Sequence, residues 1–365
     1  MNDPIGLYLH IPFCASKCPY CDFYSLRSKD PAAMERYAHS LEQTIREQGE
    51  KLGRSADTIY FGGGTPSVLP PKAFQSLLCA AQEAFPWDGV LEITVECNPS
   101  SDLETFLPAA VDSGVDRVSL GMQSAVTGER RALGRRADRE RITSCVRLAR
   151  SLGVDNISVD VMLGVPGQTS RSLDETLSFL LDLGVPHVSA YLLKLEEGTN
   201  FYRRRNTLDL PEEDLVCDLY LQTAETLESA GILPYEISNF AVPGFESRHN
   251  LKYWHGEEYL GLGPAAHSYL SGRRFFYPRD IESFQNGIPP VDDGPGGSFA
   301  ETFLLALRLT EGYRGPVPDE VLRRAKNPAL SPYLTVDEQG IRLTREGFLV
   351  SNTIITDLLL EYDES

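Results

Sequence analysis

Strand-like and helix-like segments alternate along the first part of the chain. Six short apolar runs predict strands: Gly6–His10, Thr58–Phe61, Leu91–Glu96, Arg117–Leu120, Ile157–Val161 and His187–Tyr191. Repeated strand–helix units build parallel sheets with right-handed crossovers. The small apolar strand Ile157–Val161 is typical of a sheet that is covered on both faces. The pattern therefore predicts an α/β fold, without deciding between an open sheet and a barrel.

The helix signals are clearest after the first predicted strand. Residues 31–52 have Asp30 as a candidate N-cap, Pro31 in the first turn and Gly53 as a stop signal. These are the usual start and stop signals of a helix. Four further helices are predicted at Lys72–Phe85, Leu103–Ser113, Arg139–Leu152 and Ser172–Leu183. Each of these lies between two predicted strands, as the α/β interpretation requires.

The pattern changes near Pro211. We expect a helix at Pro211–Ala230, a loop-rich stretch to about Gly297, helices at Glu301–Leu309 and Pro318–Ala325, a hairpin around Asp337–Gly340 and a terminal helix at Thr344–Glu361. Helices with one small hairpin suggest a winged-helix-like α+β unit. We therefore divide the chain into a first domain at residues 1–235, a linking region at 236–297 and a C-terminal domain at 298–365.

Charge and cysteine content restrict the class of protein. The 365 residues carry a net charge of −18 from 52 acidic and 34 basic side chains. This balance disfavours contact with phosphate backbones, so we expect no nucleic acid partner. Seven cysteines in a chain of this length do not suggest a disulfide framework. No signal peptide or membrane-spanning run is recognisable, and we expect a cytoplasmic protein.

Three of the cysteines stand close together after the first predicted strand. Cys14, Cys18 and Cys21 have the spacing C-x3-C-x2-C. Three thiolates can hold three corners of a [4Fe–4S] cluster and leave the fourth iron open to a substrate or cofactor. A structural zinc site would need a fourth ligand nearby, and no Cys or His follows before His39. Three inert core thiols are the other alternative.

This cysteine loop resembles the signature of radical S-adenosylmethionine (SAM) proteins. The longer string from Tyr8 to Cys14 reads Tyr-Leu-His-Ile-Pro-Phe-Cys and is similar to the branch that contains oxygen-independent coproporphyrinogen dehydrogenases and the HemW haem chaperones. The resemblance implies a partial (β/α)6 barrel with a winged-helix-like C-terminal domain. It also implies one [4Fe–4S] cluster, held by the three cysteines and chelated by SAM at its open iron, as a source of one-electron chemistry.

Polar and glycine-rich residues follow several predicted strands. Residues 62–65 read Gly-Gly-Gly-Thr, and glycines let a backbone approach a ligand closely, although a plain tight turn would also explain them. Glu96 could accept hydrogen bonds from ribose hydroxyls. Ligands gather at the carboxyl ends of parallel strands. The resemblance assigns SAM contacts to Tyr8, Gly63, Gly64, Thr65, Glu96, Gln123, Arg135 and Asp160. Taken singly, each could instead serve as a core residue, a helix cap or half of an ion pair.

A second motif lies in the linking region. Residues 248–254 read Arg-His-Asn-Leu-Lys-Tyr-Trp and resemble the HNxxYW motif of HemW proteins, which the dehydrogenases lack. Imidazole is a standard axial ligand of haem iron. His249 is therefore the candidate haem ligand, with His255 and His267 as alternatives. A structural histidine beside a core tryptophan would also fit this spacing.

Two more features separate the branches of the family. The dehydrogenases have an extra cysteine two residues after the third cluster ligand, where this chain has Phe23, and a long N-terminal extension, whereas this cysteine loop begins at Cys14. The resemblance to HemW implies a protein that binds haem and passes it to respiratory haem proteins, membrane-bound ones included, with little or no dehydrogenase activity. The electron donor is not indicated. The alternatives are an oxygen-independent coproporphyrinogen dehydrogenase and a radical SAM enzyme with another substrate.

Overall fold

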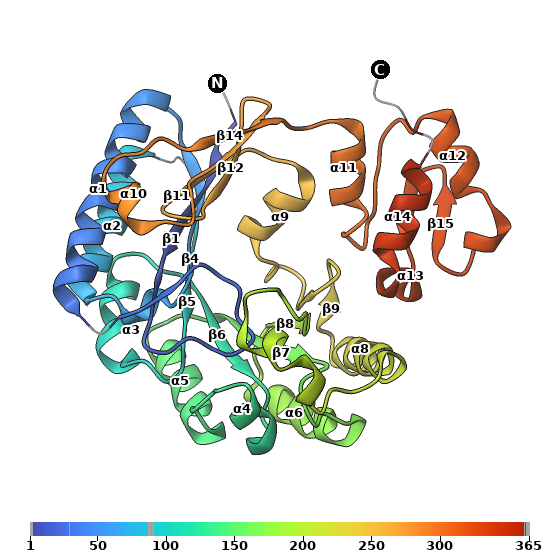
Figure 1. Ribbon diagram of the computed structural model, residues 1–365, viewed down its shortest axis with the longest axis horizontal. Helices are drawn as coiled ribbons and strands as arrows, with labels where there is room; N and C mark the ends of the chain where they lie inside the picture. Colours follow the sequence, from blue (N-terminus) through green and yellow to red (C-terminus); the bar gives the residue numbers. More distant parts are fainter. Residues whose placement is uncertain (1–2, 29, 87–88, 90, 361, 363–365) are drawn as a thin grey trace.

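A parallel sheet forms the centre of the molecule (Figure 1). The computed structural model describes residues 3–28, 30–86, 89, 91–360 and 362. The central strands are β1 (Ile5–Ile11), β4 (Ala56–Gly63), β5 (Glu92–Cys97), β6 (Arg117–Gln123), β7 (Asn156–Leu163) and β8 (His187–Leu192), which are neighbours in that order. Each pairs with the next in parallel. The six predicted strands are confirmed, most of them longer than expected, and so is the α/β fold class.

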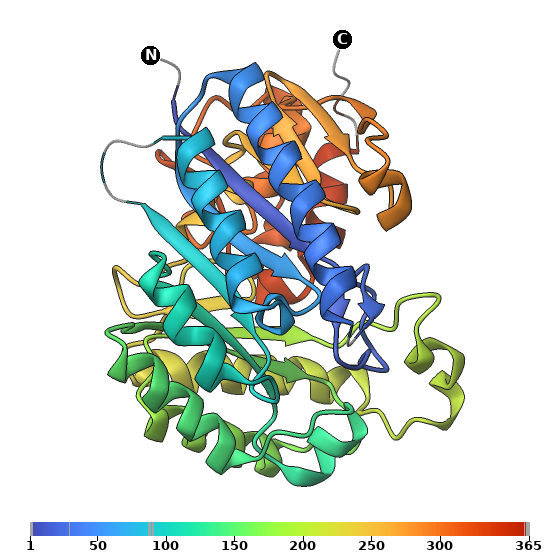
Figure 2. The same ribbon diagram turned by 90° about the vertical axis from the view of Figure 1, so that its left-hand side faces the viewer.

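Helices cover the outer face of this sheet (Figure 2). They are α1 (Pro31–Leu52), α2 (Pro71–Ala84), α3 (Leu103–Asp112), α5 (Arg139–Ser151), α6 (Ser170–Leu183) and α8 (Glu213–Ser229). The short helices α4 (Thr127–Ala132) and α7 (Asn200–Arg203) lie in the segments that follow β6 and β8, and 3-10 turns form at Pro66–Val68 and Arg205–Thr207. Asp30 caps α1 by accepting a hydrogen bond from the Ala32 amide at 3.1 Å. Gly53 ends it with φ of 57°, a conformation that favours glycine. The predicted start and stop signals of this helix are confirmed.

Further strands extend the sheet at both edges. On one side β11 (Tyr259–Leu262) pairs in parallel with β1, and β12 (His267–Leu270), β13 (Arg273–Phe276) and β14 (Val291–Pro295) follow as antiparallel neighbours. On the other side β10 (Asn239–Ala241) and β9 (Leu233–Pro234) follow β8. The described residues therefore form a 12-stranded sheet with β14 and β9 at its edges, which does not close into a barrel.

Residues 236–297 thus contain regular elements where we expected mainly loops. Besides the strands they form α9 (Arg248–His255) and α10 (Ile281–Gln285). Strands of three to five residues are too short for the apolar alternation by which strands are recognised in a sequence. They form here because strands β1 and β8 offer free edges for pairing. The proposed domain boundaries remain predictions.

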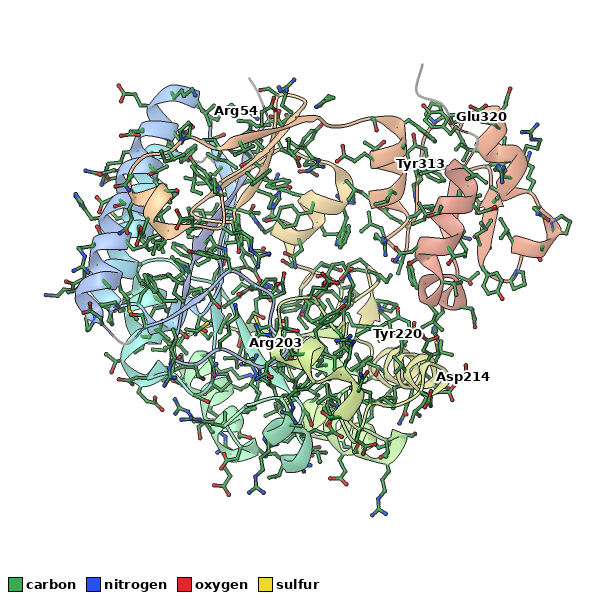
Figure 3. All side chains as sticks on the ribbon, viewed as in Figure 1. Arg54, Arg203, Asp214, Tyr220, Tyr313 and Glu320 are labelled. Atoms are coloured by element: carbon green, nitrogen blue, oxygen red, sulfur yellow. The ribbon has the colours of Figure 1, made fainter. Side chains whose placement is uncertain are left out.

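The C-terminal residues form a separate small unit beside the sheet (Figure 1). It contains α11 (Phe299–Ala306), α12 (Asp319–Ala325), a 3-10 turn at Pro328–Leu330, the hairpin β15 (Leu334–Asp337) and β16 (Gly340–Leu343), α13 (Arg345–Leu349) and α14 (Ser351–Leu359). Tyr313, labelled in Figure 3, packs edge-on against Phe299 and Phe303 of α11. This aromatic cluster joins α11 to the segment that leads into α12.

The terminal helix predicted at Thr344–Glu361 is two helices, and Glu361 lies outside the described residues. The break is at Val350, whose backbone leaves the helical region at φ −117° and ψ 20°. A side chain at Gly347 would lie 1.9 Å from the carbonyl oxygen of Tyr333, so α13 packs directly against the hairpin. The turn at Val350 then lets Ile354, Ile355 and Leu358 of α14 face the core.

Candidate functional site

A cavity opens inside the curved sheet at the carboxyl ends of the parallel strands. Its volume is about 490 Å³, within the usual range for a small-molecule site. Ten of the predicted site residues line it: Cys14, Cys18, Cys21, Gly63, Gly64, Thr65, Glu96, Gln123, Arg135 and Asp160. They come from five different strand ends and from the segment that leads into α5. The fold therefore brings the predicted cofactor residues together, apart from Tyr8 and His249.

The cysteines lie on a loop between two very short strands, β2 (Phe13–Cys14) and β3 (Leu26–Arg27). Cys14 is buried at the end of β2, and its Sγ lies 3.5 Å from the Thr65 Oγ1. Cys18 and Cys21 are partly exposed, and the Cys21 amide donates to the Cys18 carbonyl at 3.2 Å. Among the residues that the structure describes, no three His, Cys, Asp or Glu side chains converge on a single metal ion. In a cubane each thiolate would instead bind its own iron.

Neighbouring segments hold this loop from several sides. Arg279, before α10, forms an ion pair with Asp22 at 3.2 Å. The Phe201 amide of α7 donates to the Pro19 carbonyl at 2.9 Å. Arg135 donates to the Tyr20 hydroxyl from Nη2 at 2.9 Å and from Nε at 3.1 Å. The cysteine loop is therefore fixed by the fold and does not depend on its own short strands alone.

The glycine segment lies directly against the end of β1. The Gly64 amide donates to the Ile11 carbonyl at 2.8 Å. A Cβ at Gly64 would lie 2.6 Å from the Phe13 carbonyl oxygen, and one at Gly63, where φ is 102°, would lie 2.4 Å from the His10 ring. Both positions therefore require glycine. This contact sets the glycine segment beside the cysteine loop, and it leaves the backbone open to the cavity.

Two carboxylates line the cavity from strands on either side of β6, Glu96 on β5 and Asp160 on β7. Glu96 accepts a hydrogen bond from the Tyr60 hydroxyl at 2.9 Å, and Asp160 accepts one from Ser119 at 3.0 Å. Burial, followed by the nearby charge of Asp160, raises the pKa of Glu96 to about 7. Burial also raises the pKa of Asp160. The charged forms of both acids therefore lack solvation that a polar ligand with hydroxyl or ammonium groups could supply.

Gln123 has an unusual backbone at the end of β6. Its φ is 73°, a region that residues other than glycine rarely adopt. The pairing of β6 with β7 shifts register between Gly121 and Gln123. Bulges and strained residues of this kind cluster at functional sites, where they redirect a side chain. Here the irregularity coincides with a residue that lines the cavity.

Tyr8 lies in the interior but not at the cavity wall. Its hydroxyl lies 3.1 Å from His10 Nδ1, and the other ring nitrogen of His10 lies 2.9 Å from the carbonyl oxygen of Tyr24. The Tyr8 ring stacks on those of Tyr60 and His249 with centroid distances of 6.1 and 6.5 Å. Tyr8 therefore connects the start of the cysteine loop with the aromatic interior, and its contact with SAM stays a prediction.

His249 is fully buried at the other end of the parallel strands. Helix α9 packs against Gly6 of β1 and Thr58 of β4, and Glu92 accepts hydrogen bonds from the backbone amides of Arg248 and His249 at the helix start. Thr58 Oγ1 lies 2.8 Å from His249 Nδ1, and the Tyr253 hydroxyl lies 2.7 Å from Nε2. Burial, with nearby positive charges, lowers the pKa of His249 to about 3. The imidazole is neutral, but both nitrogens have partners.

The two alternative histidines are exposed and differ from each other. His255 lies 3.1 Å from a carboxylate oxygen of Glu311, and a hydrogen bond with Glu257 raises its pKa, which favours the protonated ring. The ring of His267 stacks on Phe276 at 5.2 Å, and among the described residues its nitrogens have no hydrogen-bond partner. Burial lowers the pKa of His267. On accessibility and charge, His267 is the histidine best prepared to meet an iron from solution.

The cavity also contains residues that the sequence analysis did not select. Among them are Tyr60, Arg117, Ser119, Ser189 and Asn250. They belong to the inward-facing positions of β4, β6 and β8 and to α9, so strand alternation could in principle have pointed to the first four. Asn250 sits next to His249 in the motif, yet Asn250 lines the cavity and His249 does not.

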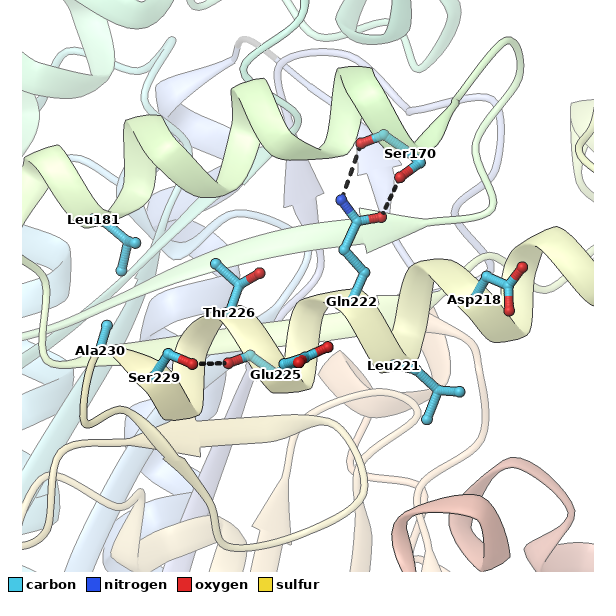
Figure 4. A pocket seen from close by; sticks show the side chains of 9 residues that line it. All are labelled: Ser170, Leu181, Asp218, Leu221, Gln222, Glu225, Thr226, Ser229 and Ala230. Atoms are coloured by element: carbon cyan, nitrogen blue, oxygen red, sulfur yellow. Dashed lines mark hydrogen bonds between the residues drawn. The ribbon is translucent and has the colours of Figure 1, made fainter.

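A second hollow of about 670 Å³ lies between α6 and α8 on the outer surface (Figure 4). Gln222 of α8 spans it and exchanges hydrogen bonds with the hydroxyl and carbonyl of Ser170 at 2.8 and 3.1 Å. Its walls contain no histidine, cysteine or basic side chain. This hollow is the space beside two helices that hydrogen bonds join, and none of the residues predicted to bind a cofactor lines it.

Comparisons with known proteins agree with this arrangement. The model of the radical SAM superfamily matches residues 8–180. The heme chaperone HemW of Lactococcus lactis is 32% identical over 380 residues, which cover 99% of each chain. HemW of Escherichia coli K12 is 32% identical over 385 residues, covering 98% of this chain and 99% of the relative. Coproporphyrinogen III oxidase HemN from E. coli has a TM-score of 0.84 at 22% identity, covering 97% of this chain and 90% of that one, a likeness of fold alone.

Proposed function

Because this chain belongs to the HemW family of radical SAM proteins, we propose that it is a haem chaperone that holds a [4Fe–4S] cluster and SAM, binds haem and delivers it to other haem proteins. The observation that carries the proposal is the meeting of the cysteine loop, the glycine segment and two carboxylates in one cavity. Residues so far apart in the sequence have no shared structural task at this place, whereas a common ligand explains all of them.

The donor set fits the two cofactors. Cys14, Cys18 and Cys21 would each hold one iron, and the bound cluster with SAM would supply one-electron chemistry. Gly63 and Gly64 expose backbone groups where a Cβ would be blocked, which suits the polar end of SAM. Glu96 would accept hydrogen bonds from the ribose hydroxyls. The work of the chain is to bind, orient and shield these groups.

The proposed haem ligand needs a rearrangement before it can bind iron, whereas the proposed SAM residues already line an open cavity. His249 can bind an iron only if Nε2 loses its contact with the Tyr253 hydroxyl or Nδ1 its contact with Thr58. We keep His249 as the proposed ligand because the motif resembles that of the family. His267 is the competing candidate on accessibility, and the side chain of His255 is held between two carboxylates.

Delivery to haem proteins, a cytoplasmic location and respiratory acceptors are part of the same proposal. No helix in the described part of the chain is both long and apolar enough to cross a membrane. All seven cysteines are free thiols, as suits a reducing compartment.

The decisive experiment uses the full-length protein, reconstituted with iron and sulfide under anaerobic conditions. Haem is titrated into wild type and into His249→Ala, His255→Ala and His267→Ala, and the Soret band is followed. We expect one haem per chain, with the band shifted or lost only in His249→Ala. Loss only in His267→Ala would move the site to β12. Transfer of the bound haem to apomyoglobin in the presence of SAM measures delivery.

The same sample separates the chaperone from the alternative enzyme. Incubation with SAM, a reductant and coproporphyrinogen should leave the substrate unchanged. Formation of protoporphyrinogen would contradict the proposal and favour a dehydrogenase. Absence of haem binding in the wild-type protein would also reject it.

A further inference from the structure

Arg117 is a buried cation without a counter-ion. It is the first residue of β6, its side chain is 2% exposed, and it lines the cavity. Nε has no hydrogen-bond partner, and within the described part of the chain the guanidinium forms no ion pair. A charge that leaves water and gains no partner is costly, because the protein interior solvates ions poorly. This residue therefore needs an explanation that packing does not provide.

The nearby carboxylates are already bound to other groups. Glu96 accepts from Tyr60, and Asp160 accepts from Ser119. Glu92, at the amino end of β5, accepts the two backbone amides at the start of α9. The charge of Arg117 acts on the pKa of Glu96 and of Asp160, so these acids are close, yet neither reaches ion-pairing distance. Among the described residues, these acids are therefore held by other groups and form no ion pair with Arg117.

A hydrogen-bond donor of α9 lines the same cavity. This is Asn250, and among the described residues its side-chain amide has no hydrogen-bond partner. Helix α9 begins against Glu92 at the amino end of β5, and Arg117 is likewise at the amino end of its strand. A guanidinium together with an amide is suited to a carboxylate, since the planar fork of arginine matches its two oxygens.

We propose that Arg117, together with Asn250, forms a carboxylate-binding subsite at the end of the cavity opposite the cysteines. The position follows from the topology, because Arg117 is at the amino end of β6 while the cysteines follow the carboxyl end of β1. The choice of ligand rests on the proposed function. The carboxylate is a propionate of the porphyrin, because SAM would chelate the open iron of the cluster through its own amino acid end, beside the cysteines.

The test compares each ligand with a partner that lacks the carboxylate. Haem is compared with haem dimethyl ester, and SAM with its decarboxylated analogue, on the anaerobically reconstituted full-length protein. The variants are Arg117→Met, Arg117→Lys and, as a matched control, Arg273→Met, which removes an exposed arginine paired with Asp292. Dissociation constants are measured by absorbance titration for haem and by equilibrium dialysis for SAM.

Wild type should bind haem about tenfold more tightly than its dimethyl ester, as expected for a charged hydrogen bond inside a protein. Arg117→Met should remove this preference by weakening only the binding of haem, Arg117→Lys should retain part of it, and Arg273→Met should leave it unchanged. The SAM arm is the control, because replacing Arg117 should not change the preference for SAM over its decarboxylated analogue.

Equal binding of haem and its dimethyl ester by wild type overturns the subsite, even if the variants do not fold. A folded Arg117→Met protein that loses affinity for both equally also overturns it, since Arg117 would then serve the surrounding structure. Loss of the preference for SAM over its decarboxylated analogue in this variant would overturn the choice of haem as the ligand. If haem does not bind wild type at all, the proposed function fails together with the subsite, whereas haem binding without a preference for the acid rejects the subsite alone.

Discussion

The two ends of the parallel strands differ in how accessible their candidate ligand-binding residues are. At the carboxyl ends, ten predicted residues from distant parts of the chain surround an open cavity. At the amino ends, the contiguous motif at residues 248–254 folds into α9, and its histidine is enclosed by Thr58 and Tyr253. The histidine of a continuous motif is thus enclosed by β4 and by its own helix, whereas a scattered set of residues forms the accessible site.

Electrostatics shows the same contrast. Burial raises the pKa of Glu96 to about 7 and lowers that of His249 to about 3. Both shifts reflect poor solvation of a charge. Glu96 borders space that a ligand can fill, so its unfavourable burial can be relieved by binding. His249 borders only protein, so it must first exchange a partner. We therefore expect cofactor binding to be prepared at the cavity and to require rearrangement at α9.

The largest expected effect comes from the cysteine loop. Cys18→Ala removes one of three protein sulfurs, and iron and sulfide content after reconstitution should fall from about four per chain to near zero. Cys79→Ala, which changes an exposed cysteine on α2, is the control and should retain the cluster. If the two ends are independent, haem binding survives in Cys18→Ala. If Cys18→Ala retained a full cluster, Cys18 would not be a cluster ligand, and the cavity end would not be the cofactor site that we contrast with α9.

The glycine segment should give the next largest effect. In Gly64→Ala the new Cβ would lie 2.6 Å from the Phe13 carbonyl oxygen, so the segment must move away from the cysteine loop. We expect a loss of about 1–3 kcal/mol in the free energy of unfolding and weaker SAM binding by dialysis. Gly128→Ala is the control, because nothing lies within 4 Å of its Cβ. If Gly64→Ala and Gly128→Ala had the same free energy of unfolding and the same SAM affinity, the close contact of Gly64 with Phe13 would not matter for the site.

A smaller change tests the closed end. Tyr253→Phe removes the hydroxyl that lies 2.7 Å from His249 Nε2. If His249 binds haem iron, the vacated nitrogen should raise haem affinity by about tenfold, the approximate free-energy equivalent of one hydrogen bond. The Soret titration measures this directly. Unchanged or weaker binding in a folded variant would indicate that Tyr253 assists the ligand or that His249 does not contact the iron.

The smallest expected effect is a pH dependence at Glu96. Its pKa rises from 4.5 to about 7 through burial and then through Asp160. Because the folded pKa lies above the unfolded one, the stability that this group contributes is complete below pH 4.5 and is lost as the pH rises through 7. The ionised form accepts ribose hydrogen bonds more strongly. SAM affinity should therefore increase about fivefold from pH 6 to 8.

Glu96→Gln supplies the control for this titration. Its SAM affinity should be flat over the same range, and its melting temperature relative to wild type should be higher at pH 8 than at pH 6. A wild-type SAM affinity that does not change with pH would mean that Glu96 is already ionised by contacts within the folded protein.

Much of the parallel core could be predicted from the sequence. Helix α1 begins and ends at local signals, Asp30 and Gly53. The central strands are recognisable because their outward-facing positions are buried and apolar, as those of Val118 and Leu120 are. The short strands β12 and β13 could not be predicted, since their pairing depends on the free edge of β11. The break at Val350 was missed for a similar reason, because it follows from the contact of Gly347 with the hairpin.

For the site, the sequence by itself determined which chemical groups are present: the cysteine loop, the glycine segment and the carboxylates at strand ends. Their order along strands that run in one direction also determined that they would share one edge. Only the tertiary structure decided that His249 faces inward to Thr58 and Tyr253 while Asn250 and Arg117 face the cavity. The reason is that spacing fixes which residues share an element, whereas access to a ligand depends on which other elements cover it.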